Sequence, residues 1–373
     1  MLDNKGFDDW AFDYDEAVSM SDKRDAYPFA GYADMMKSIR KTVREKGRAR
    51  VLDLGFGTGA FTSALYADGC EIWGQDFSEK MVEEAKEKMP KAHLVTGDFC
   101  GGLAPELAAN SYDCIVATYS LHHFASDGEK IRFIRSLMPL LNDGGVFIMG
   151  DVAFETRAEY EFERRLAAEE WDDDECYSVY EELEPELPGT EFEKISHCGG
   201  VFRLTKEAYE SGCQCRERTG LTERQIKRLF EKYLRLLRIT PPWDVKLELV
   251  RDPGWRKTGD FRIDCDDRKA VLMLNVLEPK NSNMEEVIVH ELMHIKLYPL
   301  DQVTESLILS AFPDEGPAQD FAYRQFFTSL EQTVEELAKC FLKEFGEDKE
   351  FSFGRCKSFK SFNELYDGLK SID

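Results

Sequence analysis

The chain has 373 residues, more than one ordinary hydrophobic core organises, so its length predicts two domains. It carries 72 acidic and 48 basic side chains, and this net charge of −24 repels polyanions and disfavours a nucleic-acid partner. No apolar run approaches membrane-spanning length and the N-terminus lacks a signal-peptide pattern, so we expect a cytoplasmic protein with no membrane partner and reduced cysteines.

The first informative stretch is Val51–Phe61, where a short apolar strand leads into a glycine-dense turn. Glycine lets the backbone reverse tightly and lets a ligand approach main-chain N–H groups. Through Gly55, Gly57 and Ala60 the turn also fits a dinucleotide fingerprint, so the pattern alone leaves two ligands open. Asp53 favours S-adenosylmethionine (SAM), because a carboxylate there would repel a pyrophosphate but can accept a hydrogen bond from an ammonium group.

Acidic residues follow two of the next strands. Asp76 lies about twenty residues beyond the glycines, where a carboxylate can bind both ribose hydroxyls. Asp98 and Phe99 follow the third strand, where they can contact an adenine amino group and its ring face. Strands that alternate with helical segments predict a doubly wound α/β sheet with the ligand at its carboxyl ends. The predicted strands are 51–54, 71–75, 93–96, 113–118 and 144–149.

With these motifs, residues 1 to about 205 resemble a class I SAM-dependent methyltransferase of the ubiquinone/menaquinone-methyltransferase type, which acts on small molecules. The opening segment Phe7–Asp15 resembles the family's lid over the cofactor. The resemblance implies a Rossmann-like sheet of seven strands, with an antiparallel hairpin from Phe192–Cys198 and Val201–Leu204. It also implies that the cofactor contacts Tyr14, Asp53, Gly55, Phe56, Gly57, Thr58, Gly59, Asp76, Phe77, Met81, Asp98, Phe99 and Ala117.

The segment after the fourth strand contains Tyr119, His122 and His123, where the family places its acceptor-facing loop. Either histidine can deprotonate a hydroxyl, a phenol or an acidic carbon, since imidazole titrates near neutral pH. The alternative is that one histidine caps the next helix and the other packs. Neither Asn-Pro-Pro-Tyr nor Pro-Cys follows this strand, which disfavours an amide, a nucleobase amine or cytosine C5 and favours another small-molecule acceptor.

Half of the net negative charge lies in residues 155–194, which hold sixteen acidic and four basic side chains. Charge runs such as Trp171–Glu175 are usually solvated faces. The functional alternative is a cap over the acceptor pocket, lined by Trp171, Tyr177 and Tyr180, that favours a cationic or neutral small molecule.

A second, unrelated motif lies in Asn283–Leu297, which is predicted to form a helix with His290 and His294 on one face and Glu291 beside them. This H-E-x-x-H arrangement supplies two imidazole ligands for zinc and a carboxylate that can take a proton from zinc-bound water. No histidine follows His294, so the third ligand is expected to be acidic.

The helical segment Ser329–Leu342 presents Glu331 and Glu335 on one face. Resemblance to metallopeptidases with a glutamate third ligand, the gluzincins, implies that Glu331 binds zinc and Glu335 supports a ligand histidine. The reverse assignment remains open, as does a solvated face without metal.

The remaining predicted elements give a C-terminal α+β domain that resembles a small zincin. They are an amphipathic helix over Leu221–Ile239, a strand over Val245–Leu249 and a hairpin of Phe261–Cys265 with Ala270–Asn275. The predicted domains are therefore 1–205 for methyl transfer, 206–221 as a polar linker, 222–348 as the metallopeptidase-like domain and 349–373 as a tail. The first hypothesis is a small-molecule methyltransferase fused to a domain that can bind zinc and a peptide. The alternatives are a zinc peptidase regulated by SAM and a non-catalytic scaffold.

Overall fold

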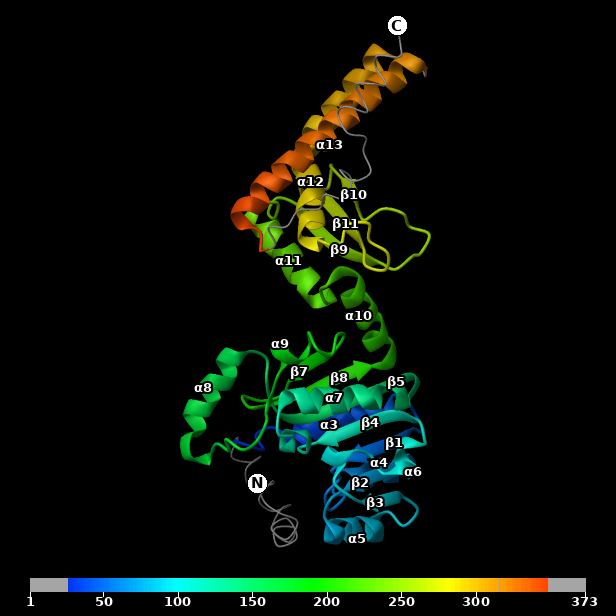
Figure 1. The fold of residues 1–373 in the computed structure, drawn as a ribbon, viewed down its shortest axis with the longest axis vertical. Coiled ribbons are helices and arrows are strands. Elements are labelled where there is room, and N and C mark those ends of the chain that lie inside the picture. Colours follow the sequence, from blue (N-terminus) through cyan, green and yellow to red (C-terminus); the bar gives the residue numbers. More distant parts are fainter. Residues whose placement is uncertain (1–25, 315, 348–373) are drawn as a thin grey trace, which may run out of the picture. The chain divides into compact units, whose positions relative to one another are not determined.

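The computed structural model describes residues 26–314 and 316–347 (Figure 1). The predicted lid segment with Tyr14 and the predicted tail 349–373 lie outside these residues. The chain divides into two compact units between Cys213 and Gln214, eight residues beyond the predicted end of the methyltransferase domain. Within the described residues, no helix is both long enough and apolar enough to cross a membrane.

The first unit is built around one mixed sheet with the strand order β3-β2-β1-β4-β5-β8-β7. The first five strands are parallel, β8 runs antiparallel to β5, and β7 runs antiparallel to β8. The predicted Rossmann-like sheet with its antiparallel hairpin is therefore confirmed, and a short β6 beside β5 is an addition to it. The strands are β1 Arg50–Leu54, β2 Glu71–Asp76, β3 His93–Thr96, β4 Tyr112–Thr118, β5 Leu141–Phe154, β6 Ser178–Val179, β7 Glu191–Lys194 and β8 Gly199–Thr205.

Helices cover both faces of this sheet because its strands are apolar on both sides. In β1, Val51 belongs to one buried cluster and its neighbour Leu52 to another, as alternation along a strand requires. The first cluster packs under α3 (Tyr32–Arg44), α4 (Thr62–Ala67) and α5 (Glu79–Lys88), and the second under α6 (Pro105–Ala108), α7 (Asp127–Leu137) and α9 (Tyr180–Leu183). The result is a three-layer α/β unit, to which α8 (Arg157–Ala167) is added (Figure 1).

The second unit has a three-stranded sheet in the order β10-β11-β9, packed against helices. The predicted hairpin is present, since β10 and β11 pair antiparallel, while β9 pairs parallel to β11. A single core joins the sheet to the helices, with Leu272, Ile288 and Val334 buried together. The elements are α11 Glu223–Leu236, β9 Asp244–Val250, β10 Gly259–Asp264, β11 Lys269–Asn275, α12 Met284–Ala311 and α13 Pro317–Phe345.

Residues 206–221, which we expect to form a polar linker, are mostly helical. Helix α10 spans Lys206–Thr219. Its composition explains this, since Lys, Glu, Ala, Gln and Arg are good helix formers and only one glycine lies inside the helix. Gly220 follows with a positive φ of 74°, and Thr222 then begins α11 with a capping box completed by Gln225. The turn between the two helices is therefore short.

Candidate functional site

A cavity of about 240 Å³ lies at the carboxyl ends of β1, β2 and β4 in the first unit. The structure brings nine of the predicted cofactor residues to its wall: Gly55, Phe56, Gly57, Thr58, Asp76, Phe77, Met81, Asp98 and Phe99. Three predicted residues, Asp53, Gly59 and Ala117, do not line it. Among further lining residues, sequence reasoning missed Tyr32, Phe61, Cys100 and Ser120.

The turn after β1 needs glycine at position 55 for two reasons. Gly55 has a φ of 75°, in the left-handed region that other residues seldom adopt. A Cβ at this position would also lie 2.5 Å from the Cβ of Ser120, whose hydroxyl donates a hydrogen bond to the carbonyl of Leu54 at 2.8 Å. The close approach of β1 and the segment after β4 therefore shapes the floor of the cavity.

Asp76 is held rigidly at the end of β2. One carboxylate oxygen accepts a hydrogen bond from the N–H of Gly57 at 2.8 Å, and the other accepts from the N–H of Ser78 at 3.0 Å. Burial raises the pKa of this carboxyl, whereas the backbone N–H groups lower it. Asp98, at the end of β3, accepts in the same way from the N–H of Cys100 at 2.8 Å. Two carboxylates thus face the cavity in fixed orientations.

Asp53 lies beneath the glycine turn and is 1% exposed. Its Oδ2 accepts a hydrogen bond from the hydroxyl of Thr62 at 2.7 Å, while its Oδ1 has no hydrogen-bond partner among the described residues. Burial raises the pKa of Asp53 to about 7, with a further contribution from the nearby Asp76. A buried carboxylate oxygen without a donor fits a cationic ligand above it, reached directly or through water.

The part of the cavity wall formed by Tyr119 is aromatic. Tyr119 follows β4 with a φ of 49°, and its N–H donates to the carbonyl of Gly150 at 2.8 Å. Its ring lies 4.9 Å from that of Phe29 and 5.7 Å from that of Tyr32, measured between centroids. A non-glycine residue in this conformation is uncommon and is often found at functional sites.

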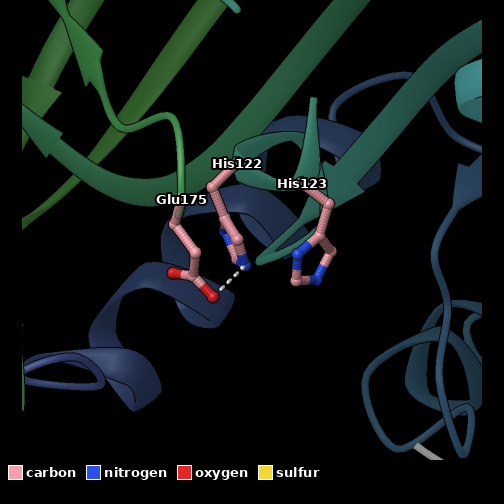
Figure 2. Close-up of side chains that lie close together, drawn as sticks. All are labelled: His122, His123 and Glu175. Atoms are coloured by element: carbon pink, nitrogen blue, oxygen red, sulfur yellow. Dashed lines mark ion pairs between the residues drawn. The ribbon is translucent and has the colours of Figure 1, made fainter. Parts of the chain in front are cut away.

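The two predicted histidines have different surroundings (Figure 2). His123 lines the cavity, whereas His122 lies behind it and is 7% exposed. Burial lowers the pKa of His123 to about 4, so its imidazole is neutral at neutral pH. His122 Nδ1 lies 2.6 Å from Asp151 Oδ1, and its Nε2 lies 3.6 Å from Glu175 Oε1. The idea that one histidine caps α7 is wrong, because the side chain of Ser126 does so.

Sequence reasoning missed both partners of His122. Asp151 lies within β5, in an apolar run. The only sequence signal for it is an acidic residue near the carboxyl end of a strand. Glu175 lies in the acidic stretch Trp171–Glu175, whose composition is typical of a solvated face. The predicted cap is not seen, since none of Trp171, Tyr177 and Tyr180 lines the cavity. Trp171 and Tyr177 pack in the core instead.

In the second unit, the two histidines of the H-E-x-x-H motif lie close to Glu331, a glutamate of helix α13. The Nε2 atoms of His290 and His294 lie 3.3 Å apart. Glu331 places one carboxylate oxygen 3.5 Å from His290 Nε2 and the other 3.4 Å from His294 Nε2. The edge between two ligands of a tetrahedral zinc ion with bonds of about 2.0–2.1 Å is about 3.3–3.4 Å. These three side chains therefore match the spacing of a zinc site.

Glu335 has a different contact, because one of its oxygens lies 3.1 Å from His290 Nδ1, the nitrogen on the far side of the ring. This hydrogen bond holds the pKa of Glu335 low, at about 2. Burial raises the pKa of Glu291 to about 7. A side chain at Gly259, where edge strand β10 begins, would collide with Glu291. The backbone of an edge strand thus passes close to the motif.

Residues 51–145 match a family described as a methyltransferase domain. An uncharacterized methyltransferase of Alkaliphilus oremlandii is 31% identical over 199 residues, which cover 53% of this chain and 86% of the relative. An uncharacterized methyltransferase of Bacillus mycoides is 37% identical over 156 residues, which cover 42% of this chain and 69% of the relative.

Among solved structures, a S-adenosylmethionine-dependent methyltransferase from Clostridium acetobutylicum superposes with a TM-score of 0.38 at 18% identity, covering 52% of this chain and 98% of that one. The magnesium protoporphyrin IX methyltransferase of Synechocystis, solved with bound SAH, gives a TM-score of 0.38 at 19% identity, covering 47% and 83%.

Proposed function

This chain belongs to the class I SAM-dependent methyltransferases, and we propose that it methylates a neutral or cationic small molecule at the His123 side of its cavity. The observation that carries the proposal is the cavity, whose wall contains two fixed carboxylates together with Tyr119 and His123. Bound SAM supplies a methyl group on a positively charged sulfur.

Different residues of the cavity are proposed to contact different parts of SAM. We propose that Asp76 accepts hydrogen bonds from the ribose hydroxyls and that Asp98 and Phe99 contact the adenine. The glycine turn admits the methionine part, and Asp53 beneath it attracts the ammonium group. Because Asp53 does not line the cavity, its contact is expected to pass through the turn or a water molecule.

Methyl transfer is an in-line displacement, so the protein must mainly align the acceptor and exclude water. Tyr119, with Phe29 and Tyr32 against it, gives the acceptor side an apolar wall. His123 is neutral and lines the cavity, so it can accept a hydrogen bond from a protic acceptor. The acidic stretch near Glu175 supports a neutral or cationic acceptor over an anionic one.

The acceptor class can be tested by incubating the protein with methyl-labelled SAM and a cell extract separated into small molecules, protein and nucleic acid. We expect label in the small-molecule fraction, retained on a cation exchanger or neutral. Asp76→Ala is the control that should transfer no label. Label in protein or nucleic acid would contradict a small-molecule acceptor.

We predict that SAM affinity depends on pH through Asp53. Its raised pKa means that the carboxyl is mostly neutral at pH 6 and mostly ionised at pH 7.5, so the ammonium group of SAM is attracted more strongly at the higher pH. The ionised fraction of such a carboxyl is about eightfold larger at pH 7.5 than at pH 6. The ammonium group of SAM loses part of its charge over the same pH range, so we expect binding to be about fivefold tighter at pH 7.5. Calorimetric titration at both pH values measures it.

The control for this prediction is Asp53→Asn, which removes the titrating charge without changing the size of the side chain. Ionising a buried carboxyl with a raised pKa lowers the free energy of unfolding as pH rises, so this variant should unfold at the same or a higher temperature at pH 8. It should bind SAM weakly and with little dependence on pH. An unchanged fivefold dependence in the variant would rule out Asp53 as its source.

A second candidate function rests on the C-terminal unit. We propose that His290, His294 and Glu331 bind zinc. The two histidine Nε2 atoms lie 3.3 Å apart, and each lies 3.4–3.5 Å from one of the two Glu331 oxygens, spacings close to those between ligands of one tetrahedral ion. Glu335 supports His290 from behind, as is usual for a histidine ligand. When bound, zinc would supply a Lewis acid and would activate a water molecule. Glu291 would be the carboxyl group of the motif available to hold a proton, and edge strand β10 could pair with an extended peptide.

A further inference from the structure

A second group of metal-binding side chains lies in the first unit, beside the methyltransferase cavity. His122, His123 and Glu175 each offer one ligand atom, and these atoms all lie within 4.8 Å of one another. Figure 2 shows the carboxylate of Glu175 beside the His122 ring, with His123 next to them. The two histidines belong to the turn Leu121–His123 after β4, whereas Glu175 comes from the segment before β6, so the chain fold brings them together.

Hydrogen bonds orient His122 and Glu175 from the far side. Asp151 Oδ1 lies 2.6 Å from His122 Nδ1, which leaves His122 Nε2 directed toward Glu175 Oε1 at 3.6 Å. The hydroxyl of Tyr177 donates to the other oxygen of Glu175 at 2.5 Å. The N–H of Cys176 donates to the carbonyl of His122 at 2.8 Å and ties the two segments together. A histidine held by a buried carboxylate, with its second nitrogen facing other ligands, is the usual support of a metal site.

The charge around the cluster also favours a cation. Asp151 is 2% exposed, and it and Glu175 carry two negative charges. The buried Lys130 supplies one positive charge, and its ammonium group donates to Ser178 Oγ at 2.9 Å and to the carbonyl of Cys176. With neutral imidazoles, these two carboxylates exceed the one ammonium group by one negative charge, and Asp127, whose Oδ1 lies 3.5 Å from Lys130 Nζ, adds another carboxylate. A buried charge is costly unless it is paired or bound to a metal.

We propose that His122 Nε2, His123 and Glu175 bind a divalent transition-metal ion, with zinc as the reference ion, at the acceptor side of the methyltransferase cavity. Two imidazoles and one carboxylate form a donor set suited to such ions. The 3.6 Å between His122 Nε2 and Glu175 Oε1 is close to the ligand spacing of a tetrahedral site, and side-chain rotation brings His123 to the same ion. Three protein ligands leave one position open, and His123 places that position at the cavity.

The catalytic role of this ion rests on the proposed methyl transfer. The binding of the ion does not depend on that function. When the ion is present, the single lone pair of the neutral His123 imidazole binds it, so a protic acceptor contacts the open position of the ion in place of His123. There it loses its proton to water more readily, because the ion lowers the pKa of a bound O–H, S–H or N–H group. The acceptor's lone pair then forms a bond to the methyl carbon while the carbon–sulfur bond breaks, and the sulfur keeps that electron pair as a neutral thioether. The ion keeps its charge throughout, so the step needs no oxidant or reductant.

The test uses the full chain carrying His290→Ala and His294→Ala, which removes the other histidine pair. Zinc binding is measured by calorimetric titration and by metal analysis after desalting, and Co²⁺ replaces zinc as a spectroscopic probe. We expect about one equivalent of zinc and visible absorption bands of four-coordinate Co²⁺. Adding Glu175→Gln should weaken zinc binding at least tenfold, and adding His123→Ala should remove it. Glu170→Gln, a matched change at an exposed acidic residue of the same stretch, should have no effect.

Each outcome decides the proposal. Equal zinc binding in the Glu175→Gln, His123→Ala and Glu170→Gln proteins would overturn it and would direct attention to another group, such as Glu163, His197 and Cys198. If the His290→Ala, His294→Ala protein bound no zinc, the proposal would also be overturned. His122 would then be only an ion-pair partner of Asp151 and Glu175. Binding of S-adenosylhomocysteine (SAH) is measured in parallel, because Glu175 does not line the cavity and its loss should leave SAH affinity within threefold. If the His290→Ala, His294→Ala protein did not bind SAH, the proposed methyltransferase function would fail, whatever the result for zinc.

Discussion

Replacing Asp76 with asparagine is expected to weaken the binding of SAM and SAH about 100-fold. The carboxylate is proposed to accept two hydrogen bonds from ribose hydroxyls, and each charge-assisted bond contributes about 1.5–3 kcal/mol. The substitution also places an NH₂ group opposite the N–H of Gly57 or of Ser78, where the carboxylate now accepts, so the glycine turn must rearrange. Calorimetric titration with SAH, which cannot donate a methyl group, measures the loss.

The matched control for Asp76 is Glu79→Gln, an exposed acidic residue in the first turn of α5 three positions away. It should bind SAH like the unchanged protein. Thermal unfolding of both variants separates loss of the ligand site from loss of the fold. An Asp76→Asn protein that is folded and binds SAH within threefold of normal would contradict the assignment of the ribose site.

Replacing His290 with alanine is expected to reduce the zinc bound by the C-terminal unit from about one equivalent to less than a tenth. Two of the three protein ligands then remain, and a structural or catalytic zinc site needs at least three. Glu331→Gln should weaken zinc binding at least 100-fold, whereas Glu335→Gln should weaken it about tenfold, the effect expected of a residue that only orients a ligand histidine. These proteins carry His123→Ala, the change expected to remove zinc from the other proposed site, so that this site does not contribute.

Two outcomes would contradict this zinc assignment. Equal zinc in the His290→Ala protein would rule out the H-E-x-x-H motif as the binding site. A larger loss from Glu335→Gln than from Glu331→Gln would reverse the roles of the two glutamates. Cleavage of a mixed peptide library that Glu291→Gln abolishes would add a peptidase activity, while zinc without cleavage would leave the ion a structural role.

Local sequence predicted the parts of the cavity that one strand end or turn supplies by itself. The glycine turn, Asp76 and Asp98 each follow a short apolar strand, and parallel strands bring their carboxyl ends together at one edge of a sheet. The structure adds that Asp53 lies beneath the cavity rather than in its wall, because its side chain turns toward Thr62. That orientation depends on packing between β1 and α4, which no local pattern specifies.

The residues that sequence reasoning missed reach the site through tertiary structure. Tyr32 comes from α3, and Glu175 comes from a stretch whose composition resembles a solvated surface. Glu175 is held near His122 by a backbone hydrogen bond between Cys176 and His122, a contact across more than fifty residues of chain. In the second unit, both glutamates on α13 share one helical face, and only the packing of α13 against α12 distinguishes Glu331 from Glu335.

The central claim is that the cavity at the carboxyl ends of β1, β2 and β4 holds the methyl donor with its sulfur toward the histidine cluster. A crystal structure of the full chain with SAH tests it most directly. We predict ribose hydroxyls within hydrogen-bond distance of the Asp76 carboxylate and the SAH sulfur on the side of the cavity lined by Tyr119 and His123. SAH bound elsewhere, or bound with its sulfur directed away from His123, would contradict the account.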